Sequence, residues 1–189
     1  RDRAEAVHDH ERLVASTVAA HGFEVVPEKQ LALQVGLPPD ECRECVNVLV
    51  DRGELQRASR SGSVLSTARL EEAGERATAA AREYFGANPR RRSFPKLELK
   101  KALGAGDVFF GDLIAALEGS GAVEEVDGGK LRFRDFGPQL TEADDEMRTG
   151  LSAALIAQPF LPPAPEELAA ERGWDQGAVL EIASLLEDE

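Results

Sequence analysis

Apolar positions recur along the chain in one pattern that appears three times. In each copy a short helical stretch ends at a glycine, and a longer helix follows with apolar residues spaced three or four apart. The glycines lie 68 and 69 positions apart and are Gly36, Gly104 and Gly173. The leucines near the ends of the following helices keep the same separations and are Leu49, Leu117 and Leu186. The pattern predicts three tandem units of nearly constant length.

Each unit also opens with a longer amphipathic helix, and the first two units end in strand patterns. The opening helices are predicted over 4–20, 67–85 and 141–156. The last helix of each unit, here called its closing helix, is predicted over 38–51, 107–118 and 175–187. Alternating residues predict one hairpin from 55–58 and 64–66, and another from 123–126 and 131–133. Three helices followed by a two-stranded hairpin is the order of elements in a winged helix.

The predicted fold class is mainly α with small β-hairpins (α+β), arranged as tandem winged-helix domains. The first unit spans 1–66, the second 67–139 and the third 140–189, which is truncated before its wing. The expected flexible joint is 88–94, with a second near 137–138, and the prolines between 159 and 165 are interpreted as a structural loop. Because the chain begins with Arg1 and its one methionine is Met147, we expect a segment of a longer protein.

The charge balance narrows the classes of function. The chain has 35 acidic and 22 basic residues, and the formal net charge of −13 repels polyphosphate unless cations cluster locally. Sequence-indifferent coating of nucleic acid is therefore not expected. No apolar run approaches the roughly 18 residues of a membrane span, and no signal segment is present, so we expect a cytoplasmic protein without a membrane partner.

The residues that usually carry chemistry are sparse. The sequence contains no phosphate-binding loop, no dinucleotide-binding glycine motif and no zinc-protease or nucleophile-elbow motif, so we predict that this segment is not an enzyme. Cys42 and Cys45 are interpreted as core residues of a protein in a reducing compartment, and the three histidines lie too far upstream to complete a metal site. No catalytic residue, metal or cofactor is expected in the segment.

Four stretches resemble a known family. They are AREYF at 81–85, NPRRRSFPKLELKK at 88–101, FRDFGPQLT at 133–141 and LPPAPEEL at 161–168. In this order they are similar to the C-terminal tandem winged-helix region of the bacterial selenocysteine-specific elongation factor, SelB. The resemblance spans nearly the whole chain, and its weight comes from the order of the segments.

The resemblance implies a role in translation. It implies a parent GTPase, binding GTP and magnesium, that carries selenocysteyl-tRNA to the ribosome and is tethered to an mRNA hairpin by four winged helices. The GTPase and tRNA-binding domains and the winged helix that grips the hairpin are absent from this sequence. The remaining segment is expected to be a rigid spacer between the GTPase and tRNA-binding domains and the winged helix that grips the hairpin. The alternative is a winged-helix protein-interaction module of a transcription or chromosome-organisation complex, whose acidic faces dock basic partners.

The residues themselves disfavour reading of DNA by the closing helices. Such a helix needs cations or amides on its exposed face. The helix at 38–51 carries Asp40, Glu41, Glu44 and Asp51, against Arg43, Asn47 and the neighbouring Arg52. The helix at 107–118 carries Asp107, Asp112 and Glu118 without a cation of its own. These faces would repel phosphate.

Basic residues gather elsewhere, between 89 and 101 and in the wing of the second unit. The stretch 89–101 has an excess of five positive charges. The candidate RNA-backbone contacts are Arg90, Arg91, Arg92, Lys96, Lys100, Lys101, Lys130, Arg132 and Arg134. If the two clusters converge they can touch RNA phosphates through charge and shape. The other interpretation is a solvated loop whose cations balance acidic neighbours.

Overall fold

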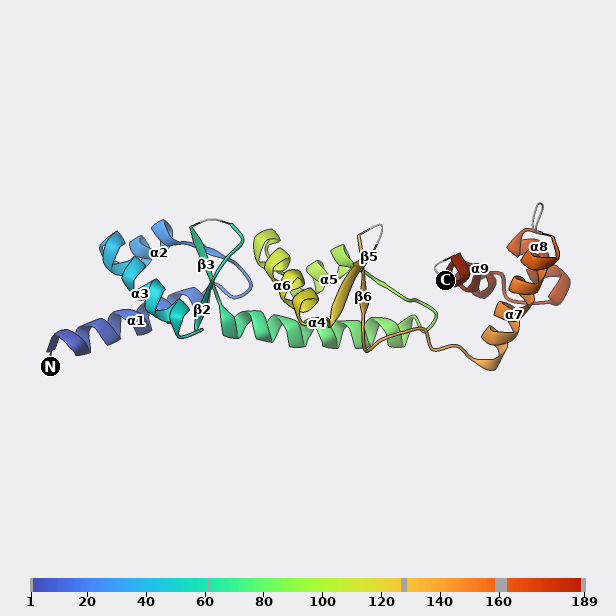
Figure 1. Ribbon diagram of the computed structural model, residues 1–189, viewed down its shortest axis with the longest axis horizontal. Helices are drawn as coiled ribbons and strands as arrows, with labels where there is room; N and C mark the ends of the chain where they lie inside the picture. The colour runs from blue at the N-terminus through green and yellow to red at the C-terminus, as the bar shows by residue number, and fades with distance from the viewer. Residues whose placement is uncertain (1, 61, 127–128, 159–162, 188–189) are drawn as a thin grey trace.

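The computed structural model describes residues 2–60, 62–126, 129–158 and 163–187. The hairpin turn predicted around 127–128 and the first part of the proline-rich loop, 159–162, lie outside these ranges. The described elements form three groups in a row, and the molecule is elongated (Figure 1). The long helix α4 (Thr67–Ala87) runs along the middle group and links it directly to the first.

The first unit contains three helices and a three-stranded sheet. Its elements are α1 (Asp2–Ala20), β1 (Val26–Pro27), α2 (Glu28–Val35), α3 (Pro39–Asp51), β2 (Leu55–Arg57) and β3 (Ser63–Ser66). The sheet is antiparallel in the order β1-β3-β2, with Val26 opposite Val64. α2 ends at Gly36, whose φ of 69° lies in the left-handed region that glycine adopts at little cost.

The second unit repeats this arrangement. After α4 its elements are β4 (Phe94–Pro95), α5 (Lys96–Leu103), α6 (Asp107–Gly119), β5 (Val123–Val126) and β6 (Lys130–Phe133). The sheet order is β4-β6-β5, with Phe94 opposite Leu131. Phe94 therefore occupies the same position in the second sheet as Val26 does in the first.

The described elements of the third unit are all helices. Its elements are α7 (Glu142–Ala157), α8 (Pro165–Arg172) and α9 (Gln176–Glu187). The predicted capping box is confirmed: the Thr141 hydroxyl accepts the backbone N–H of Asp144, and the Asp144 carboxylate accepts the backbone N–H of Thr141. The predicted fold class is confirmed.

Two features differ from the expectations. Each sheet has a third strand, β1 or β4. The sequence pattern did not predict these strands, because two residues are too few to show alternation. The linker 88–94, expected to be flexible, is held on both sides: Phe94 is buried in β4, and the carbonyl of Pro89 accepts the N–H of Gln139 at 2.7 Å. The linker therefore belongs to the second sheet at one end and contacts the entry to the third unit at the other.

Among the described residues, buried side chains form three clusters. One gathers residues between Val14 and Val64, one between Leu65 and Phe133, and one between Met147 and Leu185. The prediction that Cys42 and Cys45 are core residues is confirmed, since both lie in the first cluster. The described helices include none that is long and apolar enough to span a membrane.

Candidate functional site

Folding brings the two basic clusters of the second unit together. β4 pairs with β6, which places the end of the linker directly beside the wing strand that carries Lys130 and Arg132. Alternation along β6 turns Leu131 and Phe133 into the core and these two cations to the opposite face. The convergence that the sequence left open is therefore present.

Ion pairs with the third unit occupy Arg90 and Arg91. The Nε of Arg90 donates to the buried Asp144 at 2.8 Å, and its Nη1 lies 3.3 Å from Glu181 in α9. Arg91 lies 3.6 Å from the same glutamate. Hydrogen bonding to Asp144 raises the pKa of Arg90 further above its ordinary value. These two cations therefore connect the linker to the third unit.

Within the second unit, other candidate cations face acidic neighbours. Lys96 pairs with Glu125 at 2.6 Å, and Lys100 forms an ion pair with Asp107. Arg132 approaches Glu124 only to 3.5 Å. Lys101 and Lys130 are exposed, and the Arg134 guanidinium lies against Gly121. The interpretation of cations balancing acidic neighbours thus describes part of the set.

A hollow of about 360 Å³ opens where linker and wing meet. It is lined by Arg92, Ser93, Glu124, Glu125, Val126, Lys130 and Arg132. Three cations and two carboxylates thus border one depression on the outer face of the sheet. We call it the basic hollow.

The acidic faces of the closing helices have further contacts that the sequence did not indicate. Asp107, at the start of α6, is paired with Lys100, and Asp112 accepts the backbone N–H of Ser59 from the first unit at 3.1 and 3.2 Å. In α3, Arg43 pairs with Asp40 at 3.1 Å. α6 therefore uses one of its acids for contact between units.

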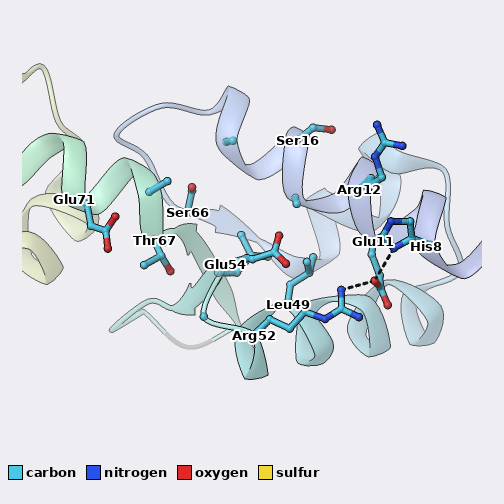
Figure 2. Close-up of a pocket in the computed structure, with 15 residues that line it drawn as sticks. His8, Glu11, Arg12, Ser16, Leu49, Arg52, Glu54, Ser66, Thr67 and Glu71 are labelled. Carbon is cyan, nitrogen blue, oxygen red and sulfur yellow. Dashed lines mark hydrogen bonds and ion pairs between the residues drawn. The ribbon is translucent and has the colours of Figure 1, made fainter.

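A groove on the first unit collects ionisable side chains from α1, the end of α3 and the start of α4 (Figure 2). Glu11 projects from α1 toward α3, and only 8% of its side chain is exposed. Its carboxylate accepts from Arg52 at 2.7 Å and lies 3.6 Å from His8. The pair joins α1 to the end of α3, so its evident role is to brace the two helices.

The chemistry of this groove is limited by those pairings. Ser16 donates its hydroxyl hydrogen to the carbonyl of Leu13, and the Thr67 hydroxyl is buried without a partner among the described residues. Neither hydroxyl contacts a histidine or carboxylate that would activate it as a nucleophile. In the part of the chain that the structure describes, no group of three metal-ligating side chains could hold an ion.

The joint between the first two units is a contact that the sequence analysis missed. Phe23, in the loop after α1, stacks on Phe109 of α6 with ring centroids 5.5 Å apart, and the Arg76 guanidinium lies 5.1 Å from the Phe23 ring. The carbonyl of Phe23 accepts the N–H of Gly106 at 3.1 Å. The local signal was short: Phe23 and Val25 lie two residues apart in the loop after α1, and both pack against the cluster of the second unit.

Comparisons with known proteins find similarity among solved structures alone. No protein-family model and no curated protein matches the chain. A solved structure of the mRNA-binding domain of elongation factor SelB from E. coli in complex with SECIS RNA is 14% identical, with a TM-score of 0.48, over 67% of this chain and 98% of that one. Bacterial selenocysteine-specific elongation factor EF-Sec is likewise 14% identical with a TM-score of 0.48, over 69% of this chain and 19% of its own. Both similar structures bear the name of the family that the four sequence segments resemble.

Proposed function

We propose that this chain is the tandem winged-helix arm of a selenocysteine-specific elongation factor and acts as a rigid spacer in the cytoplasm. In this role it links a body that binds GTP, magnesium and selenocysteyl-tRNA to a domain that holds an mRNA hairpin at the ribosome. The resemblance of four segments suggests the family. The packing between units suggests the mechanical role.

The observation that carries the proposal is the apolar core shared by the first two units. Leu65, on β3 of the first sheet, is 1% exposed and belongs to the cluster of the second unit. Phe23, Val25 and Ala58 of the first unit pack against the same cluster. Burying a large apolar side chain stabilises a packed arrangement by about 1.5–3 kcal/mol, so this joint resists bending.

The connection between these two units adds to the stiffness because no loop separates them. β3 ends at Ser66, and α4 begins at the next residue with the Ser66 hydroxyl accepting the N–H of Arg69. The Nε of Arg69 donates back to the carbonyl of Ala19 at the end of α1. A bend here would break both the cap and this hydrogen bond.

The joint between the second and third units has a different chemistry. Among the described residues, its contacts are the ion pairs of Arg90 and Arg91 with Asp144 and Glu181, while the cluster of the third unit contains residues of 140–186. Ion pairs at partly exposed sites are weakened by salt. We therefore expect the first joint to be stiffer than the second.

Spin-label distances test the spacer. In a background with Cys42→Ala and Cys45→Ala, Leu33→Cys with Ala115→Cys reports the first joint, and Ala115→Cys with Glu171→Cys reports the second; all three labelled positions are exposed. We expect narrow distance distributions by double electron–electron resonance for both pairs at moderate salt. Broad distributions for both would contradict the spacer and favour the protein-interaction module, which requires no fixed separation.

A matched pair of phenylalanine variants sharpens the result. Phe23→Ala removes the stacking partner of Phe109 and is expected to broaden only the distribution across the first joint. Phe136→Ala is the control, because Phe136 stacks on Phe85 inside the second unit at 5.7 Å. It is expected to lower stability while leaving the width of the distribution unchanged.

A further inference from the structure

The outer face of the second sheet combines features of an anion site. Lys130 and Arg132 project from the same face of the central strand β6, roughly 6.8 Å apart along the strand. Arg92, from the linker, lines the same basic hollow. Cations from two segments distant in sequence therefore converge on a space that only folding creates.

Arg132 is held incompletely in this arrangement. Its Nε is buried, and no described residue accepts that hydrogen. Its Nη1 lies 3.5 Å from Glu124, at the limit of a hydrogen bond. A buried donor left unpaired is costly, and a phosphate group, with several acceptor oxygens, can bond an arginine at two nitrogens once the side chain turns to expose them.

The local charge balance differs from that of the whole chain. Glu125, at the edge of the basic hollow, is engaged by Lys96 from the start of α5 at 2.6 Å. Glu124 is then the carboxylate that borders the basic hollow beside Lys130 and Arg132. Lys130 and Arg132 thus place two positive charges beside one carboxylate on a chain whose net charge is −13, and a polyanion would approach here in preference to the acidic helix faces.

We propose that the basic hollow binds one phosphodiester group of an RNA backbone and that Glu124 is a built-in competitor for Arg132. When the phosphate enters, Arg132 exchanges its long contact with Glu124 for a charge-assisted hydrogen bond to phosphate oxygen. No base edge is read, so binding is independent of sequence and sensitive to salt. The inference rests on the proposed function, because an arm that runs beside RNA gains a second anchor along its length.

The proposal also gives two different roles to members of the set of nine candidate cations. Arg90 and Arg91 are engaged by Asp144 and Glu181 and serve the joint with the third unit. Lys130 and Arg132, in the basic hollow that Arg92 also lines, serve the phosphate. RNA binding should therefore depend on the second set and persist when Glu181 is changed.

Fluorescence anisotropy with a labelled RNA hairpin of arbitrary sequence, at low salt, tests the site on the full chain. We expect Lys130→Ala and Arg132→Gln each to weaken binding about threefold to tenfold, and Lys130→Ala to reduce the slope of log affinity against log salt by about one. Glu124→Gln is expected to tighten binding about twofold to fivefold, because it removes the competitor while keeping the shape of the side chain.

Lys29→Ala is the matched control, since it removes one exposed positive charge from α2 of the first unit. A loss equal to that of Lys130→Ala would overturn the site in favour of diffuse attraction. An unchanged affinity in Glu124→Gln would overturn the competitor. Equal binding of a labelled polyglutamate would replace RNA by an acidic protein partner. The spin-label distances across both joints, measured without RNA, are expected to be the same in these variants, so failure of the phosphate site is distinguishable from failure of the spacer.

Discussion

The side chain of Trp174 leaves no space for a side chain at Gly150 in α7. Its indole packs so closely on α7 that a Cβ added to Gly150 would lie 2.5 Å from the ring carbon Cη2. The Arg172 guanidinium lies over the indole, 5.4 Å from the ring centroid. In the sequence Gly150 is only a weak point in a predicted helix. Close approach of the indole explains why a glycine is needed there.

Replacing Gly150 therefore has an effect opposite to that of another helical glycine. Gly150→Ala should destabilise the third unit by about 1–3 kcal/mol, because the indole must move out of its contact. Gly111→Ala, in α6, meets no atom within 4 Å and should stabilise by about 0.5–1 kcal/mol through helix propensity. Urea unfolding, followed by Trp174 fluorescence and by circular dichroism, measures both. Equal shifts of the two unfolding midpoints in the same direction would contradict the close contact between Trp174 and Gly150.

Among the elements, α7 has an N-terminus that serves two purposes. The capping box of Thr141 and Asp144 was evident from spacing alone, because the cap bonds join residues three apart. The ion pair between Asp144 and Arg90 was not, since 54 residues separate the partners. Burial acts to raise the pKa of Asp144, but hydrogen bonds from Thr141 and the contact with Arg90 outweigh it and hold the pKa below its ordinary value.

This lowered pKa predicts the acid sensitivity of the third unit. A carboxyl whose pKa is lower in the folded state stabilises the fold above its unfolded pKa, near 3.9, and loses that contribution as the pH falls through the folded pKa. We expect Asp144→Asn to lower stability at pH 7 by about 0.5–2 kcal/mol, the usual cost of a lost cap. The difference from the wild type should shrink below about pH 4. A constant difference from pH 7 to pH 3 would show that the charge has no part.

The three units differ in how they are joined, and this difference sets the mechanics of the entire chain. The first and second share buried side chains across β3 and the loop that carries Phe23. The third has a cluster of its own and meets the second through ion pairs, in which Asp144 is buried and Arg90, Arg91 and Glu181 are partly exposed. We propose that the three domains, with boundaries at 66 and 139, behave as two units in unfolding: the first and second unfold together, and the third unfolds separately.

Unfolding should therefore occur in two steps that two probes separate. Trp174 is the one tryptophan in the chain and reports the third unit, whereas circular dichroism reports every helix. We expect the fluorescence transition in urea to precede the main loss of helical signal, because a small separate core is less stable. Sodium chloride at 0.5 M should leave the later transition unchanged. Coincident transitions would contradict independent folding of the third unit.

Local patterns in the sequence were sufficient to predict the repeat, the helices, the capping box and the wings. Period, glycine position and capping spacing act within a few residues, so they are legible without a structure. The short strands β1 and β4, the loop Phe23 and the pairing of Arg90 with Asp144 depend on partners tens of residues away. The basic hollow belongs to the same class: its cations were visible in the sequence, but which of them face each other follows from the pairing of β4 with β6. Contacts of this kind carry no local signature, because chain closure and packing, rather than any neighbouring residue, determine them.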